Sequence, residues 1–408
     1  MHEIKTFFSV PFEFIPTGKL AAHDLFINSS AIKTREKFVR IFPKGEFLAE
    51  SDIATFKKKY RQLYIPETQR PLYLNSLCES SGKDTEQKAV VLKDSAIHYL
   101  DKIFSREHSS ETLTQTISEC RDVVSNMVET LRDLSIENLQ ELIGKLSFHD
   151  FYTYDHSINV SMYSILIYQA YKPEASKEEI VEAGLGGLLH DIGKIKIDTR
   201  IINSSGDLSD NDFAEIKKHP GYGFQYIMDS NMSLPKNVNR DVISRVVHEH
   251  HENFDGSGYP QKIAGRDIHV MARIVAVADF FDAVTTKRSY HEPLSTEDAL
   301  ALMGKSAGKK LDPILYQLFA ELSKHQLNTE TELELPPDFD PCQPHQKLEM
   351  ILSDGNVVFD EQDEGYGKIK IVANKNDLDD WEDNQVVQSE HITILEKEKR
   401  GKKIKKAG

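Results

Sequence analysis

The sequence is poor in cysteine and tryptophan and has no long apolar run. Its 408 residues include one tryptophan and three cysteines, which lie far apart at Cys78, Cys120 and Cys342. Three scattered cysteines argue against a disulfide framework and predict a reducing compartment. No stretch approaches the roughly 20 apolar residues that cross a bilayer, and Glu3 with two early prolines is unlike a secretion signal. We therefore expect a soluble, cytoplasmic protein without a membrane span.

Positive charge is also in short supply. Lysine and arginine total 50 against 65 aspartates and glutamates, and the resulting net charge of −15 disfavours nonspecific nucleic-acid binding. Most of the excess lies in residues 329–390, which contain 17 acidic and 4 basic residues, a net charge of −13. Histidine is concentrated elsewhere, with nine of the 16 between His149 and His291. This histidine-rich third of the chain is where we expect its chemistry.

Changes in residue pattern divide the chain. Short strand-like runs separated by proline and glycine give way to long helical patterns, and then to a Pro/Asp-rich break followed by alternating runs. We predict a multidomain protein with an all-α core: a small α+β input or adaptor domain at 1–80, a helical linker at 81–146, an all-α catalytic domain at 147–325, a β-rich acidic region at 326–395 and a basic tail at 396–408.

A heptad-like stripe runs along residues 113–134. Apolar side chains recur there at alternating spacings of four and three, from Leu113 to Leu134. One interpretation is that this stripe packs against the neighbouring domain. The other is a signalling helix that forms a homodimer through residues 113–134.

A histidine and an aspartate stand side by side at His190 and Asp191, at the end of an apolar helical run. Such a pair on a helix can bind one metal and bridge to another. Further histidines occur at His156, His219, His250 and His251. Asp279 is flanked by VAVA and FF, and a carboxylate in such surroundings requires a cation or strong donors to offset its desolvation.

These residues fall in six ordered motifs between 147 and 322. The motifs are HSIN from His156, HDIGK from His190, KKHP around His219, HHENFDGSGYP from His250 to Pro260, ARIVAVAD ending at Asp279, and KRSY containing Arg288. The set resembles the HD-GYP subgroup of the HD phosphohydrolase superfamily, which are bacterial phosphodiesterases acting on cyclic di-GMP. The resemblance implies an all-α HD core and a binuclear metal centre.

The resemblance also implies a ligand set. One metal would be held by His156, His190, Asp191 and Asp279, and a second by His219, His250 and His251, with Asp191 bridging the two. Histidine and carboxylate ligands without thiolate suit iron or manganese and permit zinc, and the family favours iron. Where some members have a glutamate that recruits a third metal, this chain has Tyr152, so two divalent ions are expected.

Several other residues are expected to act on the substrate. Lys194 lies three residues after Asp191, so its ammonium falls on the metal face and can reach a phosphate oxygen if the helix continues through Gly193. Arg288 can turn back towards the site only if its helix ends near Thr285 and Thr286. His291 stands where the family usually has Lys or Arg. Tyr259 can stack on a base, contact a partner or only shape its loop.

We therefore predict a metal-dependent phosphodiesterase that hydrolyses cyclic di-GMP to linear pGpG, with further cleavage to GMP left open, in bacterial second-messenger signalling. Asp191 and Lys194 are the predicted catalytic residues, with Lys194, Arg288, Tyr259 and His291 contacting substrate. A signalling partner would bind through the GYP loop or the N-terminal domain. The alternatives are a poorly active protein that senses cyclic di-GMP or binds proteins, and an HD hydrolase acting on another nucleotide.

Overall fold

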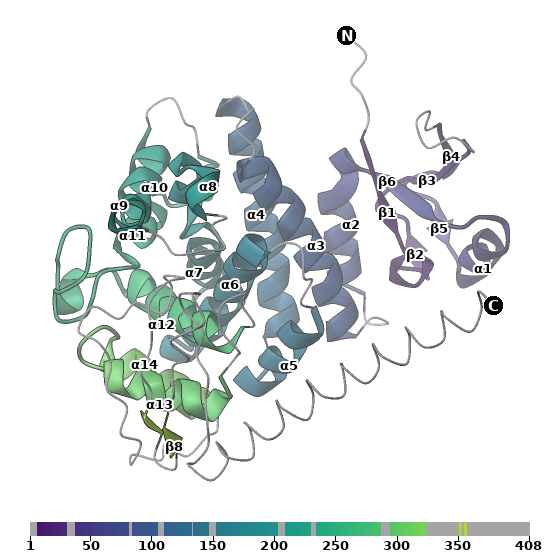
Figure 1. Cartoon of the computed structure of the whole chain (residues 1–408). Coiled ribbons are helices and arrows are strands. Elements are labelled where there is room, and N and C mark those ends of the chain that lie inside the picture. Colours follow the sequence, from purple (N-terminus) through teal and green to yellow (C-terminus); the bar gives the residue numbers. More distant parts are fainter. Residues whose placement is uncertain are drawn as a thin grey trace, which may run out of the picture.

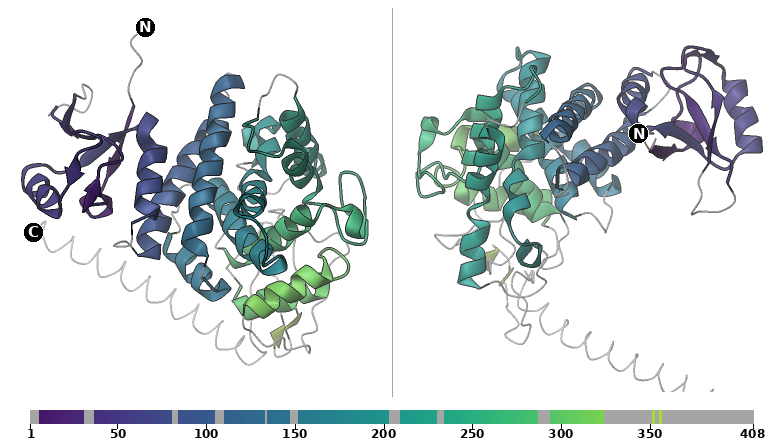
Figure 2. Two further views of the ribbon diagram at one scale, coloured as in Figure 1. Left: turned by 180° about the vertical axis from the view of Figure 1, so that it is seen from behind. Right: turned by 90° about the horizontal axis from the view of Figure 1, so that it is seen from above.

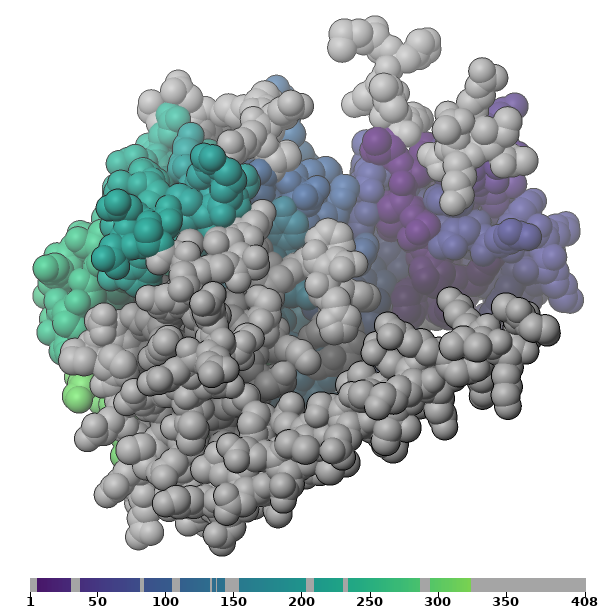
Figure 3. All heavy atoms as spheres, in the orientation of Figure 1, coloured from purple at the N-terminus to yellow at the C-terminus, as the bar shows by residue number. Residues whose placement is uncertain are grey.

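The computed structural model describes residues 6–30, 37–80, 84–104, 110–132, 134–146, 152–202, 209–229, 234–286 and 294–323, together with 351–352 and 355–356. A small sheet region at the N-terminal end is followed by a body built almost entirely of helices (Figure 1). In the space-filling view the N-terminal region, in purple, stands beside the teal and green helical body (Figure 3). Among these residues, no helix is both long and apolar enough to cross a membrane.

The N-terminal region is a four-stranded antiparallel sheet with a short ribbon and helices beside it. The sheet order is β1 (Phe7–Val10), β6 (Leu63–Pro66), β3 (Leu25–Asn28) and β4 (Phe38–Phe42), and the ribbon pairs β2 (Lys19–Leu20) with β5 (Phe47–Leu48). Its helical elements are η1 (Phe12–Phe14), α1 (Glu50–Lys59), η2 (Glu67–Gln69) and α2 (Arg70–Cys78). Alternate strand residues such as Leu25, Leu63 and Ile65 are buried, as the period of two requires. A small sheet region before the helical core is confirmed, and α2 is an addition that the sequence patterns did not predict.

Three helices connect the sheet to the rest of the body. They are α3 (Thr85–Phe104), α4 (Ser110–Leu131) and α5 (Ile136–Leu146), and they follow α2 in space in both the front and rear views (Figures 1 and 2). The heptad-like stripe on α4 is buried inside the chain, where this helix packs against α2, α3, α6 and α7. This packing accounts for the periodicity as the first interpretation proposed. Dimerisation through residues 113–134 stays a prediction, as do the domain boundaries.

The helical body is built around two apolar helices, α6 (Tyr152–Tyr171) and α12 (Val270–Thr285), with α7 (Lys177–Leu189) packed against both. Residues around most of α6 and α12 are buried, which is typical of helices inside a core. The remaining elements are η3 (Ile192–Lys196), α8 (Thr199–Ile202), α9 (Asp210–Ile216), α10 (His219–Met228), α11 (Arg240–Glu249), η4 (Gly265–Asp267), α13 (Thr296–Ser306) and α14 (Pro313–Leu322). An HD-type helical core is thereby confirmed.

The predicted end of α12 is also confirmed. The helix stops at Thr285, and Thr286 has an extended backbone. Beyond α14, the structure describes only a short antiparallel pair, β7 (Ile351–Leu352) with β8 (Gly355–Asn356). The predicted acidic region at 326–395 and basic tail at 396–408 otherwise lie outside the described residues.

Candidate metal centre

Three of the predicted histidines are oriented by the same local device. His190 follows the last residue of α7, His219 lies three residues beyond the end of α9, and His250 follows the last residue of α11. In each case ring Nδ1 faces the carbonyl oxygen of the residue three positions earlier, at 2.7 Å for His190, 2.8 Å for His219 and 2.9 Å for His250. The last carbonyls of a helix lack intrahelical partners, so a histidine at a helix end can satisfy one of them.

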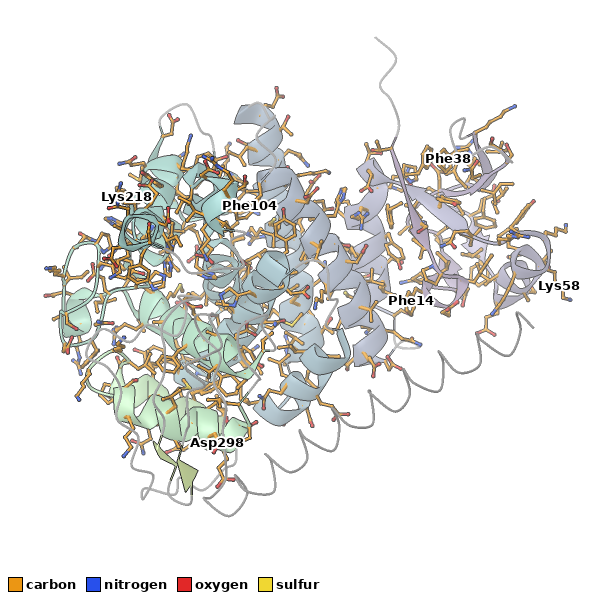
Figure 4. The ribbon with its side chains drawn as sticks, viewed as in Figure 1. Phe14, Phe38, Lys58, Phe104, Lys218 and Asp298 are labelled. Atoms are coloured by element: carbon orange, nitrogen blue, oxygen red, sulfur yellow. The ribbon has the colours of Figure 1, made fainter. Side chains whose placement is uncertain are left out.

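This arrangement determines which ring nitrogen is available to a ligand. A carbonyl oxygen only accepts, so Nδ1 carries the hydrogen and donates it, and Nε2 keeps its lone pair. Burial lowers the pKa of His219 to about 3 and holds the pKa of His250 well below its usual value, which favours the neutral ring in both. Lys218, labelled in Figure 4, is exposed, whereas the next residue, His219, is buried.

The Nε2 atoms of His219 and His250 face each other at 3.1 Å. Two lone pairs at this distance repel unless a cation lies between them. Nitrogen ligands about 2.0–2.1 Å from a zinc-like ion stand about 2.8–3.4 Å apart at octahedral or tetrahedral angles. His251, which is half-buried, completes a group in which one ring nitrogen from each histidine lies within 4.8 Å of the others. The donor set therefore fits a bound divalent metal.

A second group consists of His156, His190 and Asp191, all buried, whose ligand atoms also lie within 4.8 Å of one another. Asp191 connects the two groups, because its Oδ2 is 3.3 Å from Nε2 of His190 and its Oδ1 is 3.2 Å from Nε2 of His219. Burial alone would raise the pKa of Asp191, but Lys194 and the surrounding histidines hold it well below the usual value. An anionic carboxylate with its oxygens directed to different groups is what a bridging ligand requires.

His156 is held in a different way, between two carboxylates of α12. Its Nε2 is 3.0 Å from Oδ1 of Asp279, and its Nδ1 is 2.7 Å from Oδ2 of Asp282. Asp282 is fully buried and also accepts hydrogen bonds from Asn159 and Thr286, both 2.8 Å long. Asp282 was not among the site residues predicted from the sequence. The sequence pattern could have indicated it, because Asp282 lies three residues after Asp279, on the same helix face and equally surrounded by apolar residues.

The structure thus brings all seven predicted ligand positions together. Ring centroids are 5.4 Å apart for His156 and His190, 5.1 Å for His190 and His250, and 5.0 Å for His219 and His251. Asp191 and Asp279 join this set through the contacts described above. That these residues bind metal stays a prediction.

Lys194 lies on the metal face, but the expected reason is wrong. The α-helix does not continue through Gly193, because α7 ends at Leu189 and residues 192–196 form the 3₁₀ helix η3. Side chains three residues apart eclipse each other in a 3₁₀ helix, which places Lys194 over Asp191. Its Nζ is 2.5 Å from Oδ2 of Asp191, so the ammonium contacts the carboxylate that connects the two groups.

The loop at 252–261 borders the half-buried side of the site. The ring of Tyr259 stacks on His251 with centroids 4.9 Å apart, and the buried carboxylate of Glu252 accepts the backbone N–H groups of Gln261 and Lys262. Gly256 has a positive φ of 82°, whereas Gly258 does not. Gly258 is needed for close approach instead, because an added Cβ would lie 2.1 Å from the backbone nitrogen of Asn253.

The side chains of three residues considered from the sequence lie outside the described part of the structure. Arg288 and His291 lie outside the described residues, and although α6 begins at Tyr152, the side chain of that residue is also outside them. Thr286, immediately before this segment, donates its hydroxyl to Oδ1 of Asp282. The end of α12 is therefore tied to the carboxylate that holds His156.

Part of the chain is similar to proteins of known class. A protein-family profile described as "HD domain" matches residues 122–315. The chain is 35% identical over 177 residues to a cyclic di-GMP phosphodiesterase of Pseudomonas aeruginosa, covering 43% of this chain and 41% of that protein. It is 31% identical to a 3'3'-cGAMP-specific phosphodiesterase of Vibrio cholerae, covering 48% of this chain and 36% of the relative. A cyclic di-GMP phosphodiesterase of Thermotoga maritima is 31% identical, with 55% of each chain covered.

Residues 122–315, which fold as helices, are therefore similar to the HD domain. They contain the HDIGK motif from His190 and the HHENFDGSGYP motif from His250, on which the resemblance to HD-GYP proteins rests. The chain spans less than two thirds of the length of each of the three relatives.

Proposed function

We propose that this chain is a metal-dependent phosphodiesterase that hydrolyses cyclic di-GMP to the linear dinucleotide pGpG, with GMP as a further product to be tested. The observation that carries this proposal is the 3.1 Å approach of two histidine Nε2 atoms inside a buried donor cluster. The relatives from Pseudomonas and Thermotoga support the substrate, because both are named cyclic di-GMP phosphodiesterases.

Two ions are proposed, following the two groups of donors. His156, His190, Asp191 and Asp279 would hold one, and His219, His250 and His251 would hold the other together with Asp191. Iron is the proposed metal because of the family resemblance, and manganese or zinc would also accept these nitrogen and oxygen ligands. Divalent ions in such a site supply Lewis acidity that activates water and offsets charge on a phosphate.

The chain's own residues have distinct parts in this proposal. Asp191 stays anionic and links the two groups of donors. Lys194 has 22% of its side chain exposed while its ammonium contacts Asp191, so it can donate to a phosphate oxygen that approaches from the solvent side. Tyr259 supports His251 by stacking. Arg288 and His291 are proposed to contact the substrate from the segment that follows α12.

The wider organisation is also a proposal. Residues 1–80 would act as an input or adaptor domain, 81–146 as the connecting helices, 147–325 as the catalytic domain, and 326–395 and 396–408 as an acidic region and a basic tail. A signalling partner would bind through the GYP loop or the N-terminal domain. The few scattered cysteines support a cytoplasmic location.

The test uses the full chain prepared without oxygen. Bound metals are quantified, and hydrolysis of cyclic di-GMP is followed with Asp191→Asn as the control. Two metals per chain and turnover that the variant abolishes are expected. Tight binding of cyclic di-GMP without product would establish the sensor alternative instead. Preferred hydrolysis of 3'3'-cGAMP in competition would reassign the substrate, an outcome that the Vibrio relative makes specific.

A further inference from the structure

A fully buried lysine stands outside the matched HD domain. Lys93 lies on α3, whereas the family match begins at residue 122. Its side chain is 1% exposed, and its neighbours Ala89, Leu92 and Ala96 on the same helix are buried as well. A lysine is almost never buried to this extent unless a carboxylate pairs with it.

The partner of Lys93 lies on α6, next to a proposed ligand. Its Nζ is 3.1 Å from Oδ1 of Asp155, the residue immediately before His156. Burial lowers the pKa of Lys93, while the charges of Asp155 and Asp282 act in the opposite direction. The ammonium therefore pairs with the carboxylate beside His156 and also interacts electrostatically with the carboxylate that accepts from the His156 ring.

Further contacts join α3 to the same turn of α6. The hydroxyl of Tyr154 donates to Oδ1 of Asp101 over 3.2 Å, and its ring lies 5.7 Å from that of Phe104, which is labelled in Figure 4. Two consecutive residues of α6, Tyr154 and Asp155, are thus held by α3. The next residue, His156, is inserted between Asp279 and Asp282 of α12. The direction of the His156 ring consequently depends on contacts from both α3 and α12.

We propose that Lys93 is a positioning residue of the metal site, acting through its buried ion pair with Asp155 and the first turn of α6. Without the ammonium, the buried Asp155 carboxylate would lose the charge of Lys93, and we expect this turn to move so that water can reach it. His156 would move with it. The inference rests on the proposed metal site and adds to it a residue from outside the matched domain.

The test measures binding of Zn²⁺ to the full chain in competition with a chromophoric chelator. Lys93→Met keeps the length of the side chain and removes its charge, and Asp155→Asn removes the opposite charge. Each is expected to weaken the affinity for one of the two ions by about tenfold or more, the range found when partners of metal ligands are lost. The double variant should lose no more than the weaker-binding single variant, because the two residues act as one unit.

A matched control separates positioning from general destabilisation. Arg70 is also buried, and it pairs with Glu67 at 2.9 Å and with Asp94 of α3 at 3.3 Å, at the contact of α2 with α3. Arg70→Met is expected to lower the unfolding temperature of the metal-free protein while leaving Zn²⁺ affinity unchanged. Wild-type affinity in both Lys93→Met and Asp155→Asn would overturn the inference, and so would an equal loss in Arg70→Met.

The same measurement distinguishes this inference from the proposed function. If the wild-type chain binds no Zn²⁺, the metal site itself is wrong. If the wild-type chain binds two ions and the Lys93 and Asp155 variants bind them equally well, only the role of Lys93 is wrong.

Discussion

The histidines of the candidate metal centre are oriented by two different kinds of hydrogen-bond partner. His190, His219 and His250 are oriented by backbone carbonyls at helix ends, whereas His156 is oriented by the side chain of Asp282 and its hydrogen-bond partners. Backbone orientation depends on where a helix stops, which many side chains leave unchanged. Side-chain orientation depends on a chain of individual contacts, each of which one substitution can remove. The orientation of His156 should therefore be more sensitive to nearby substitutions than that of the other three histidines.

The largest effect is expected at Asp191, which connects the two groups of donors. Asp191→Asn removes the anionic bridge between the two groups, so metal content should fall and hydrolysis of cyclic di-GMP should drop by about 10³-fold or more. Asp198→Asn is the control, because Asp198 lies beyond η3 and forms an exposed ion pair with Arg200. Full activity in Asp191→Asn would remove the basis for treating the two groups as one centre.

A histidine that the backbone orients can be displaced by a substitution at a glycine beside it. A Cβ on Gly193 would lie 1.9 Å from the carbonyl oxygen of His219, so Gly193→Ala must displace the backbone of that histidine. We expect a loss of about 3 kcal/mol in the free energy of unfolding, measured with denaturant, together with weaker metal binding. Gly221→Ala is the matched control in the neighbouring helix, where an added Cβ meets nothing within 4 Å. Equal stability of the two variants would contradict the predicted close approach.

The orientation of His156 by a side chain can be weakened without a change in the size of that side chain. Asp282→Asn removes the negative charge that accepts from His156, and we expect the affinity for one metal ion to fall by about 10-fold to 100-fold while the other is retained. Thr286→Val removes only one of the hydrogen bonds to Asp282 and should have a smaller effect in the same direction. Metal titration of both variants checks this order. An equal loss of affinity for both ions in Asp282→Asn would show that the two groups of donors do not depend on separate contacts.

The smallest effect is a difference in titration in the metal-free protein. Burial alone would lower the pKa of His156, but hydrogen bonds to Asp279 and Asp282 raise it to about 9, whereas burial lowers the pKa of His219 to about 3. The stability contributed by His156 is complete below pH 6.5 and is lost as the pH rises through 9. The burial of neutral His219 destabilises the fold progressively as the pH falls from 6.5 towards 3.

Both groups therefore place the highest stability of the metal-free protein near pH 6.5. Thermal unfolding across pH 4–9 measures the profile, and the histidine ring resonances in NMR measure each titration. His156→Gln should flatten the alkaline side alone. An alkaline side that is unchanged in this variant would contradict the assigned role of the two carboxylates.

Much of the candidate site could be predicted from the sequence. The six motifs contain all seven predicted ligand positions, which the structure brings together, and the β-branched pair after Val284 predicted where α12 ends. Asp282 was overlooked because a second aspartate on an apolar helix carries no sign of which side chain it meets. Lys194 was placed correctly for the wrong reason, since α7 ends at Leu189 and Lys194 lies in a 3₁₀ helix that follows Asp191.

The sequence by itself determined the resemblance to HD-GYP proteins, the helical character of the core and the residue types that can bind metal. Spacing and residue chemistry are local properties, so they can be read from the chain alone. Only the tertiary structure decided that α3 supplies Lys93 to Asp155, that Asp282 accepts from His156, and that the Nε2 atoms of His219 and His250 meet. These contacts join residues separated by 31 to 126 positions, and they depend on how helices pack, which no local pattern encodes.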